Sequence, residues 1–432
     1  MTTFLRRNWD ILLIVSAGLA VRLTWLAMAR PMPISDWHFY RVLAFDILDH
    51  GQLGYPDRTT FYLPGQPAYL AVWAFFSRSD VWLGVGMIAV ATASIVLVFL
   101  VGKKVFAQRG PALLAAGLFA LIPHFVAFSP VLATEHVFVL LMLSAMAMLL
   151  YRDPERGLWL AGGAGLALGA AMLTRGEGVF YVPALVFFIW AGSRAVARRA
   201  SLQATVVLLV AAAVVVVPWY IRNSTVTDPS TGLSTGAGIN FYFAHNDSGT
   251  YGWYPQGTPF DGLPNDEASD LGWRLAFEYL AENPLRLFGD SLFGTYQLFR
   301  TPEYALFWST HHVPEGDPND PALFTERDIF GLRTAGVAVQ AASAALIVLG
   351  AAALLAWRSW SRPMATLLVP LVASTWVLRT VIYWAKPRYR YFLDVVLVFF
   401  AAFVVWLLLR AWRSEPTGRD PAKLATRSRE GR

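Results

Sequence analysis

Ten long apolar segments, separated mostly by short polar loops, limit what this chain can fold into more than any other feature. The first, residues 11–28, is long enough at about 1.5 Å of rise per residue to cross a hydrocarbon core of about 30 Å. The others are residues 81–101, 111–128, 132–150, 158–173, 179–191, 204–221, 335–357, 364–383 and 392–409. Of the 432 residues, 56% are hydrophobic and only 15% are charged, unlike a soluble protein. The pattern predicts an all-α polytopic membrane protein with about ten transmembrane helices, and therefore the lipid bilayer as a partner.

Charge and cysteine content exclude several functions. The net charge of +6 is concentrated in short clusters between apolar segments and in the C-terminal tail. That distribution suits anchoring at an anionic leaflet, and we expect no nucleic-acid partner. The chain has no cysteine, so neither a disulfide nor a thiolate nucleophile or ligand is available.

The short basic loops predict orientation. If all ten spans cross the membrane, these clusters fall on one side: Arg6-Arg7, Lys103-Lys104 with Arg109, Arg152 with Arg156, Arg194 with Arg198-Arg199, and Arg358 with Arg362. Because positive residues favour the cytoplasm, we expect both termini to be cytoplasmic, and an integral protein of the plasma (inner) membrane. Residues 1–410 then form one domain, with outer loops at 30–80 and 222–334, followed by a basic, disordered cytoplasmic tail at 411–432.

The first outer loop carries an acid at the membrane exit. Asp36 and Tyr40 are four residues apart, so they share a face if the segment is helical. A partly desolvated carboxylate there could accept a proton from a hydroxyl group. The alternative is structural, because Ser35 or Asp36 could equally be the N-cap of an amphipathic helix.

Glu135 is a second acid at the outer mouth of a span, where a charge in an apolar helix calls for an explanation. It could face the same cavity as Asp36, one acid acting as base and the other positioning the acceptor or a cation. The simpler interpretation is an ion pair with a nearby arginine such as Arg175.

Basic residues also gather on the outer side, against the usual charge bias. They are Arg222 at the end of the seventh span and Lys386, Arg388 and Arg390 in the short turn AKPRYRY. The planar guanidinium fork suits phosphate oxygens, so this cluster favours binding of a phosphate carried on a lipid. Snorkelling to ordinary headgroups is the alternative.

The large outer loop contains a predicted amphipathic helix. Asn283 could cap it, with Pro284 at its first position. Leu285, Phe288, Leu292, Tyr296 and Phe299 recur at helical spacing and form one apolar face. This face could pack against the bundle or contact lipid at the membrane surface.

Metal binding has little support in the sequence. Histidines and acids that could ligate a metal lack any recognised spacing; they are Asp36 with His38, Asp46 with His50, and Glu135 with His136 and His245. We therefore expect no required cofactor, while a divalent metal stays open. Arg22 and Arg379 lie inside predicted spans and could line a cavity or pair internally.

An ordered set of short motifs carries a resemblance. The motifs are SDWHFY and LPGQP in the first outer loop, then ATEH, LTRGEG, PWYIRN, NFYFAHNDSGTYG, ENPLRLF and PRYRYF. Over about its first four hundred residues the chain resembles the bacterial membrane glycosyltransferases of the C-type fold. That group contains protein O-mannosyltransferases, lipid A aminoarabinose transferases and lipopolysaccharide galacturonosyltransferases.

The resemblance implies inverting transfer of one sugar from a polyprenyl-phosphate donor to an extracytoplasmic glycan, lipid or protein acceptor. It matches Asp36 to the catalytic base, Glu135 to the acid of the second loop, and Arg388 and Arg390 to a basic motif at the donor phosphate. The other donor phosphate-binding candidates are Arg222 and Lys386, and the substrate-binding candidates are Tyr40, Tyr62, Arg175, His245 and Asn246. Two motifs depart from the pattern, at Pro64-Gly65-Gln66-Pro67 and His245-Asn246-Asp247, which affects acceptor choice and any metal.

Two other functions are compatible with ten spans. A secondary transporter would bind substrate near the midplane between repeated halves, whereas here no clear repeat is visible and the polar residues gather at one face. A flippase for lipid-linked sugars would share the lipid but would not need an outer pair of acids. The transferase hypothesis requires that Asp36, Glu135 and the arginines of the last outer turn converge at the outer membrane boundary.

Overall fold

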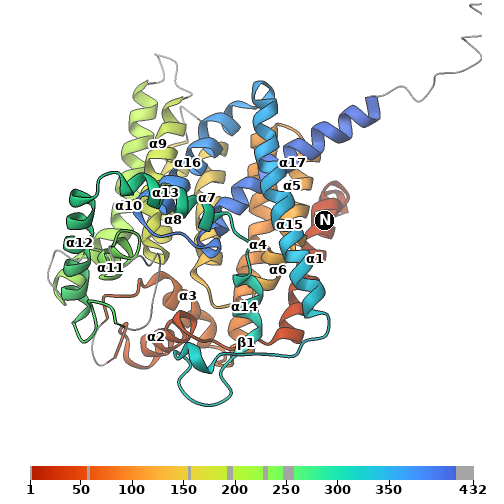
Figure 1. Cartoon of the computed structure of the whole chain (residues 1–432). Helices are drawn as coiled ribbons and strands as arrows, with labels where there is room; N and C mark the ends of the chain where they lie inside the picture. Colours follow the sequence, from red (N-terminus) through yellow and green to blue (C-terminus); the bar gives the residue numbers. More distant parts are fainter. Residues whose placement is uncertain are drawn as a thin grey trace, which may run out of the picture.

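Helices make up almost all of the regular structure in the computed structural model (Figure 1). The structure describes residues 2–55, 59–153, 157–191, 198–226, 232–246 and 257–414. The last helix, α17, continues to Ser414, so residues 411–414 of the predicted tail are helical. The rest of that tail lies outside the described residues.

Seven described helices or helical runs are long and apolar enough to cross a membrane. They are α1 (Thr2–Ala29), α4 (Asp80–Phe106), α7 (Thr134–Tyr151), α10 (Arg198–Ser224), α15 (Leu332–Ala352) with η5 (Ala353–Ser359), the run η6 (Met364–Leu368), α16 (Val369–Val377) and η7 (Leu378–Ile382), and η8 (Pro387–Arg390) with α17 (Tyr391–Ser414). Shorter apolar helices occupy the other three predicted segments: α5 (Arg109–Leu121), α8 (Leu158–Thr174), and η1 (Gly176–Tyr181) with α9 (Val182–Ala191). The prediction of an all-α membrane protein is confirmed, and ten crossings remain a prediction.

One predicted span is broken. We expected a continuous helix over residues 111–128, but α5 ends at Leu121 and α6 (Pro123–Phe128) begins after Ile122. Pro123 has no N–H to continue the ladder of α5, and it suits the first position of the new helix. The break turns the chain before it enters α7.

Small residues let two of the helices pack closely. A Cβ on Gly165 of α8 would overlap the Leu208 carbonyl of α10, and one on Gly169 would lie 2.7 Å from the Ala212 carbonyl oxygen. These two glycines therefore allow close packing of α8 (Leu158–Thr174) against α10 (Arg198–Ser224).

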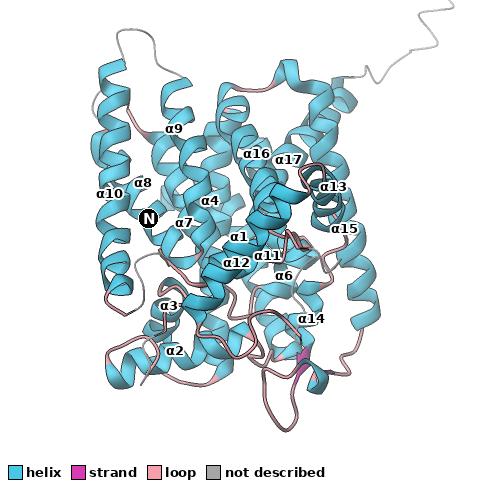
Figure 2. Cartoon of the chain, turned by 60° about the vertical axis from the view of Figure 1, so that its left-hand side comes forward, coloured by secondary structure: helices cyan, strands magenta, loops and turns pink. Residues whose placement is uncertain are grey.

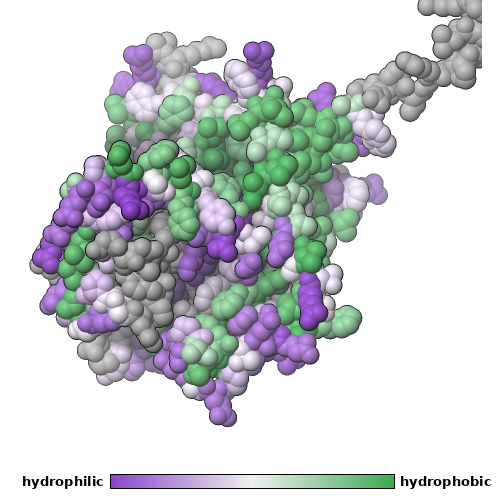
Figure 3. All heavy atoms as spheres, in the orientation of Figure 1, coloured by the Kyte–Doolittle hydropathy of each residue, from purple (hydrophilic) through white to green (hydrophobic). Residues whose placement is uncertain are grey.

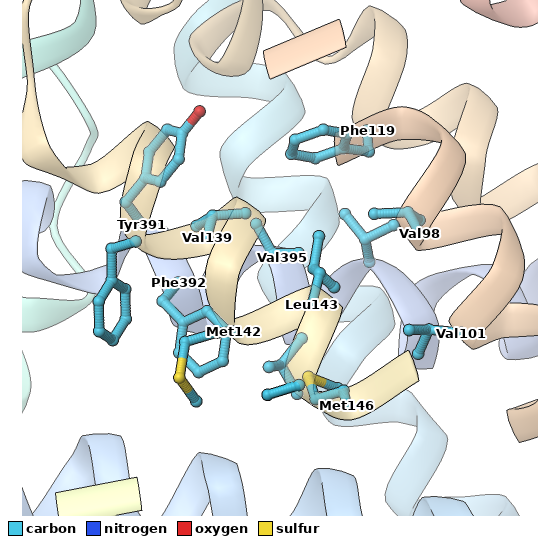
Figure 4. Packing of buried hydrophobic residues seen from close by; sticks show 14 of the residues in the cluster. Val98, Val101, Phe119, Val139, Met142, Leu143, Met146, Tyr391, Phe392 and Val395 are labelled. Atoms are coloured by element: carbon cyan, nitrogen blue, oxygen red, sulfur yellow. The ribbon is translucent and has the colours of Figure 1, made fainter. Parts of the chain in front are cut away.

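The apolar core lies between α4, α5, α7 and α17. Figure 4 shows Val98, Phe119, Leu143 and Val395, one from each of these helices, within the same packed cluster. The centre of the bundle is therefore rigid, and its outer end is supported from beneath.

The outer loops form a second layer of short helices at one end of the bundle. Figures 1 and 2 show α2 (Asp36–His50), α3 (Gly65–Ala74) and α14 (Tyr304–Thr310) gathered there. The remaining loop elements are α11 (Gly236–Tyr242), α12 (Asn265–Glu282), α13 (Arg286–Leu298), η4 (Pro321–Leu323), β1 (His311–His312) and β2 (Thr325–Glu326). The two strands pair antiparallel, with His311 opposite Glu326.

The predicted cap of α13 is wrong. Asn283 ends the preceding helix, α12, and its side-chain amide donates to the Tyr279 carbonyl. Helix α13 begins only at Arg286, with Leu285 in the N-cap position. Residues 283–286 form a turn in which the Arg286 N–H donates to the Asn283 carbonyl, so Asn283 serves the end of one helix instead of the start of the next.

Candidate active site

Asp36 is the first residue of α2, directly after a turn at Ser35. The Ser35 N–H donates to the Pro318 carbonyl at 2.9 Å, which fixes this turn to the large outer loop. Ser35 occupies the N-cap position, as one of the two structural alternatives predicted, but its side chain makes no capping hydrogen bond. Asp36 is the first residue inside the helix. The Asp36 carboxyl keeps 38% of its side chain exposed and lies at the positive end of the helix dipole.

Arg388 joins two acids that are far apart in the sequence. Its Nη2 lies 3.7 Å from Oδ2 of Asp36, and its Nε lies 3.4 Å from Oε1 of Glu135. The guanidinium also lies over the rings of Trp37, at 5.0 Å, and Tyr389, at 5.1 Å. Side chains from α2, α7 and η8 therefore meet at one point, as the transferase hypothesis required.

Glu135 is almost fully buried, and two arginines balance its charge. Besides Arg388, the Nη1 atom of Arg175 lies 2.8 Å from Oε1 of Glu135 and donates to the Thr134 hydroxyl at 2.7 Å. The predicted ion pair of Glu135 with Arg175 is confirmed, and Glu135 also lies across Arg388 from Asp36. A shared cavity with Asp36 stays a prediction.

The charge network extends to Glu177, which had no predicted role, and to Arg379, for which internal pairing was one of two predictions. The Nε of Arg175 lies 2.9 Å from Oε1 of Glu177, and Glu177 also forms an ion pair with Arg379 of η7. The Arg379 guanidinium lies 4.3 Å from the centre of the Tyr389 ring. Three carboxylates thus alternate with three guanidinium groups, which leaves the described cluster formally neutral. The sequence signal for Arg379 was its charge within an apolar span, and for Glu177 its place in LTRGEG.

Two tyrosines flank Asp36. The rings of Tyr40 and Tyr62 lie 5.4 Å apart, edge to face. Burial, followed by the negative charge of Asp36, raises the pKa of both phenols above the ordinary range. A side-chain hydrogen bond with Asp36 adds to the shift of the Tyr62 pKa. Both hydroxyls therefore stay protonated and available as donors.

Comparisons with known proteins bear on the fold. A family model described as dolichyl-phosphate-mannose-protein mannosyltransferase matches residues 70–221, less than half of the chain. The structure resembles the archaeal oligosaccharyltransferase AglB from Archaeoglobus fulgidus, in complex with an inhibitory peptide and a dolichol-phosphate, with a TM-score of 0.54 and 16% identity. The match covers 96% of this chain and 53% of AglB, so the chain spans about half of that enzyme's length. The chain has the C-type glycosyltransferase fold.

Other matches are weaker. The apo form of the Archaeoglobus fulgidus oligosaccharyltransferase gives a TM-score of 0.53 at 16% identity, covering 95% of this chain and 52% of the other. ArnT from Cupriavidus metallidurans, bound to undecaprenyl phosphate, gives a TM-score of 0.44 at 16% identity, covering 92% of this chain and 78% of ArnT. A search of curated proteins found no match.

Two of the predicted phosphate ligands, Arg222 and Arg390, lie outside the charge cluster. Arg390 is fully buried, and its guanidinium binds the Asp394 carboxylate at 2.7 Å, the Ser343 hydroxyl, and the carbonyls of Leu298 and Arg300. Arg222 donates to the carbonyls of Thr59 and Leu53 in the first outer loop. These contacts correct the sequence-based expectation, because both guanidinium groups are bound to the protein itself.

Lys386, His245 and Asn246 contact residues outside the charge cluster. The Lys386 ammonium lies 4.6 Å from the centre of the Trp384 ring. Partial removal from water, together with the positive charge of Arg388, lowers the pKa of Lys386 to about 8. The Nε2 of His245 is 3.0 Å from the Val381 carbonyl oxygen, and the Asn246 amide donates to the Tyr242 carbonyl. Asp247 of the same motif lies outside the described residues.

The described residues form no cluster of three metal ligands. In the described part of the chain, no three His, Asp or Glu side chains gather to hold an ion. The ring nitrogens of His136 are taken by the Tyr391 hydroxyl and the Phe128 carbonyl, and a nitrogen of His38 faces Arg41. Metal dependence remains a prediction. Arg22 proves internal, because it donates to carbonyls of α1 and α5.

Proposed function

We propose that this protein transfers one monosaccharide from a polyprenyl-phosphate donor to an acceptor hydroxyl, with inversion at the anomeric carbon. The observation that carries the proposal is the position of Arg388 between Asp36 and Glu135. It places a phosphate-binding group beside a solvent-accessible carboxylate, the combination that transfer from a sugar phosphate needs. The family model and the dolichol-phosphate held by AglB support a lipid-linked donor.

In the proposed reaction, Asp36 is the general base. It accepts the proton of the acceptor hydroxyl as that oxygen attacks the anomeric carbon from the side opposite the phosphate. The bond between the anomeric carbon and the phosphate oxygen breaks, and polyprenyl phosphate leaves as an anion. The protonated hydroxyls of Tyr40 and Tyr62 orient the carboxylate and the substrate.

Arg388 and Lys386 would stabilise the leaving phosphate. In the structure, Arg388 is paired with Asp36 and Glu135. An incoming phosphate would compete for the guanidinium and weaken its ion pair with Asp36, so that the carboxylate could contact the acceptor hydroxyl instead. Glu135 would then keep Arg388 in position from the buried side, with Arg175 holding Glu135.

The proposed site faces the extracytoplasmic side, with both termini in the cytoplasm. Asp10, near the start of α1, pairs with Arg109 at the start of α5, so these two ends lie together. Both belong to the side rich in basic loops, which the charge bias assigns to the cytoplasm. The acceptor would be a glycan, a lipid or a protein.

The test is transfer by purified protein in detergent or nanodiscs, supplied with radiolabelled polyprenyl-phosphate sugars and cell-envelope acceptors. We expect labelled product or slow donor hydrolysis, and a loss of turnover in Asp36→Asn of about 10²–10⁴-fold with donor binding retained. Near-normal turnover in this variant would contradict the assignment of the base.

Asp49→Asn is the matched control. Asp49 lies on the same helix, and its carboxylate forms an exposed ion pair with Arg78, away from the cluster. This variant should turn over at the normal rate. Movement of a lipid-linked sugar across liposomes without any bond cleavage would instead favour a flippase or transporter.

A further inference from the structure

Helix α13 presents its apolar face outwards. Leu285 is 88% exposed, Phe288 71%, Leu292 57% and Tyr296 62%. These residues recur every three or four positions, so they form one continuous stripe along the helix. In water, so much exposed apolar surface on one helix would be unfavourable.

The opposite face of α13 is more polar, and it points into the protein. Asp290 lies there with its Oδ2 3.6 Å from the Nδ1 of buried His245. The indole N–H of Trp376 donates to the Thr295 hydroxyl at 3.0 Å, and Gly294 and Leu298 are buried. The helix is therefore inverted relative to one on the surface of a soluble protein.

The position of α13 explains this inversion. In Figures 1 and 2 the helix lies beside the bundle at the level of α16, away from the end that carries α2 and α3. Trp376 and Val377 belong to the membrane-spanning run that includes α16, and each is 40% exposed. Because Trp376 bonds to α13, the apolar stripe continues the lipid-facing surface of that run, and Figure 3 shows green, apolar atoms over this region.

Charges at both ends of α13 fit the same environment. Arg286 begins the helix and Arg300 follows it, and both are exposed. Long cationic side chains at the ends of an apolar stripe can reach the phosphates of lipid headgroups while the stripe contacts acyl chains.

We infer that α13, although it belongs to the large outer loop, is embedded in the outer leaflet, with its apolar stripe against phospholipid acyl chains. The lipid contact supports the neighbouring site from the side. His245 binds the Val381 carbonyl and faces Asp290, so it connects α13 to the segment η7 that carries Arg379. The inference does not depend on which reaction the site performs.

The absence of cysteine makes the test direct. Single-cysteine variants Phe288→Cys and Leu292→Cys are labelled with bimane, and the full-length protein is placed in phosphatidylglycerol–phosphatidylethanolamine nanodiscs. Glu267→Cys, at an exposed position in the first turn of α12, is the control. Nitroxide-labelled phospholipid should quench the labels at 288 and 292 several-fold more strongly than the control label at 267. Aqueous iodide should quench the control label more strongly than the labels at 288 and 292.

Two results would overturn the inference. Iodide quenching at 288 and 292 as strong as at 267 would place the stripe in water. Protection from both quenchers, with crosslinking between protein molecules at position 292, would show that a second copy covers the stripe. Both substituted side chains are more than half exposed, so the substitutions remove little buried contact and the variants should fold.

Discussion

Glu177→Gln isolates the part of the charge network that holds Arg379. Glu177 bridges Arg175 and Arg379, and only 9% of its side chain is exposed. In the variant, Arg175 still pairs with Glu135, whereas Arg379 loses its carboxylate partner and keeps only the Tyr389 ring. The described cluster then has two acids and three guanidinium groups in place of three of each.

The magnitude follows from burial. Removing one partner of a buried ion pair costs about 3–5 kcal/mol, because the other charge stays desolvated. The ring contact offsets part of this loss, so we expect about 3 kcal/mol for Glu177→Gln. The double variant Glu177→Gln/Arg379→Gln should lose less unfolding free energy than the sum of the losses of the two single variants. The difference, the coupling energy, should be about 1–3 kcal/mol.

The assay is reversible unfolding of the purified protein in mixed micelles, followed by tryptophan fluorescence and circular dichroism. Asp49→Asn, which removes an exposed ion pair with Arg78, should lose far less stability and serves as the control. If the losses of the two single variants simply add in the double variant, Glu177 and Arg379 are not coupled and the network is wrong.

Further predictions follow from individual contacts. Arg388→Ala should raise the Michaelis constant for the donor or abolish lipid binding, and unchanged values would reassign this residue to headgroup anchoring. Because the pKa of Lys386 is lowered to about 8, it is charged at pH 7 and loses its charge as the pH rises through 8. Donor affinity, measured by lipid-binding titration, should fall over that range, and Lys386→Arg should flatten the fall. Gly165→Ala should lower the unfolding midpoint, because the added Cβ would overlap α10. Gly162→Ala is the control: its Cβ would meet only a Val207 methyl at 3.5 Å, so the midpoint should stay unchanged or rise slightly.

The lengths of the apolar segments predicted most of the fold. Each of the ten apolar segments falls on helix, because the bilayer admits few other structures for an isolated apolar run. The sequence analysis did not predict the break at Ile122. It also placed Asn283 at the start of α13, whereas this residue lies at the end of α12. In both places a proline follows directly, and whether a proline begins a helix or only separates two of them depends on packing around the turn.

Charge inside apolar sequence predicted most of the candidate site. Asp36, Glu135 and Arg388 come together as the sequence hypothesis required, since each would be unfavourable at the membrane boundary without partners. The sequence analysis did not identify Glu177 as a site residue, because a single acid in a short loop carries no periodic signal. The sequence analysis also left open which way the apolar stripe of α13 faces, because an amphipathic pattern shows that two faces differ but not which one contacts lipid.

Arg388 and Arg390 show where sequence reasoning reaches its limit. Both lie in the same basic turn, and the sequence assigned them the same role. In the structure the turn is the 3-10 helix η8, in which successive residues advance by about 120°, so residues two apart point in different directions. Arg388 therefore faces Asp36 and Glu135, while Arg390 is buried against Asp394, one helical turn further along. Of two arginines in one motif, Arg388 lies in the charge cluster where we propose phosphate binding, and Arg390 fixes the last helix to the protein.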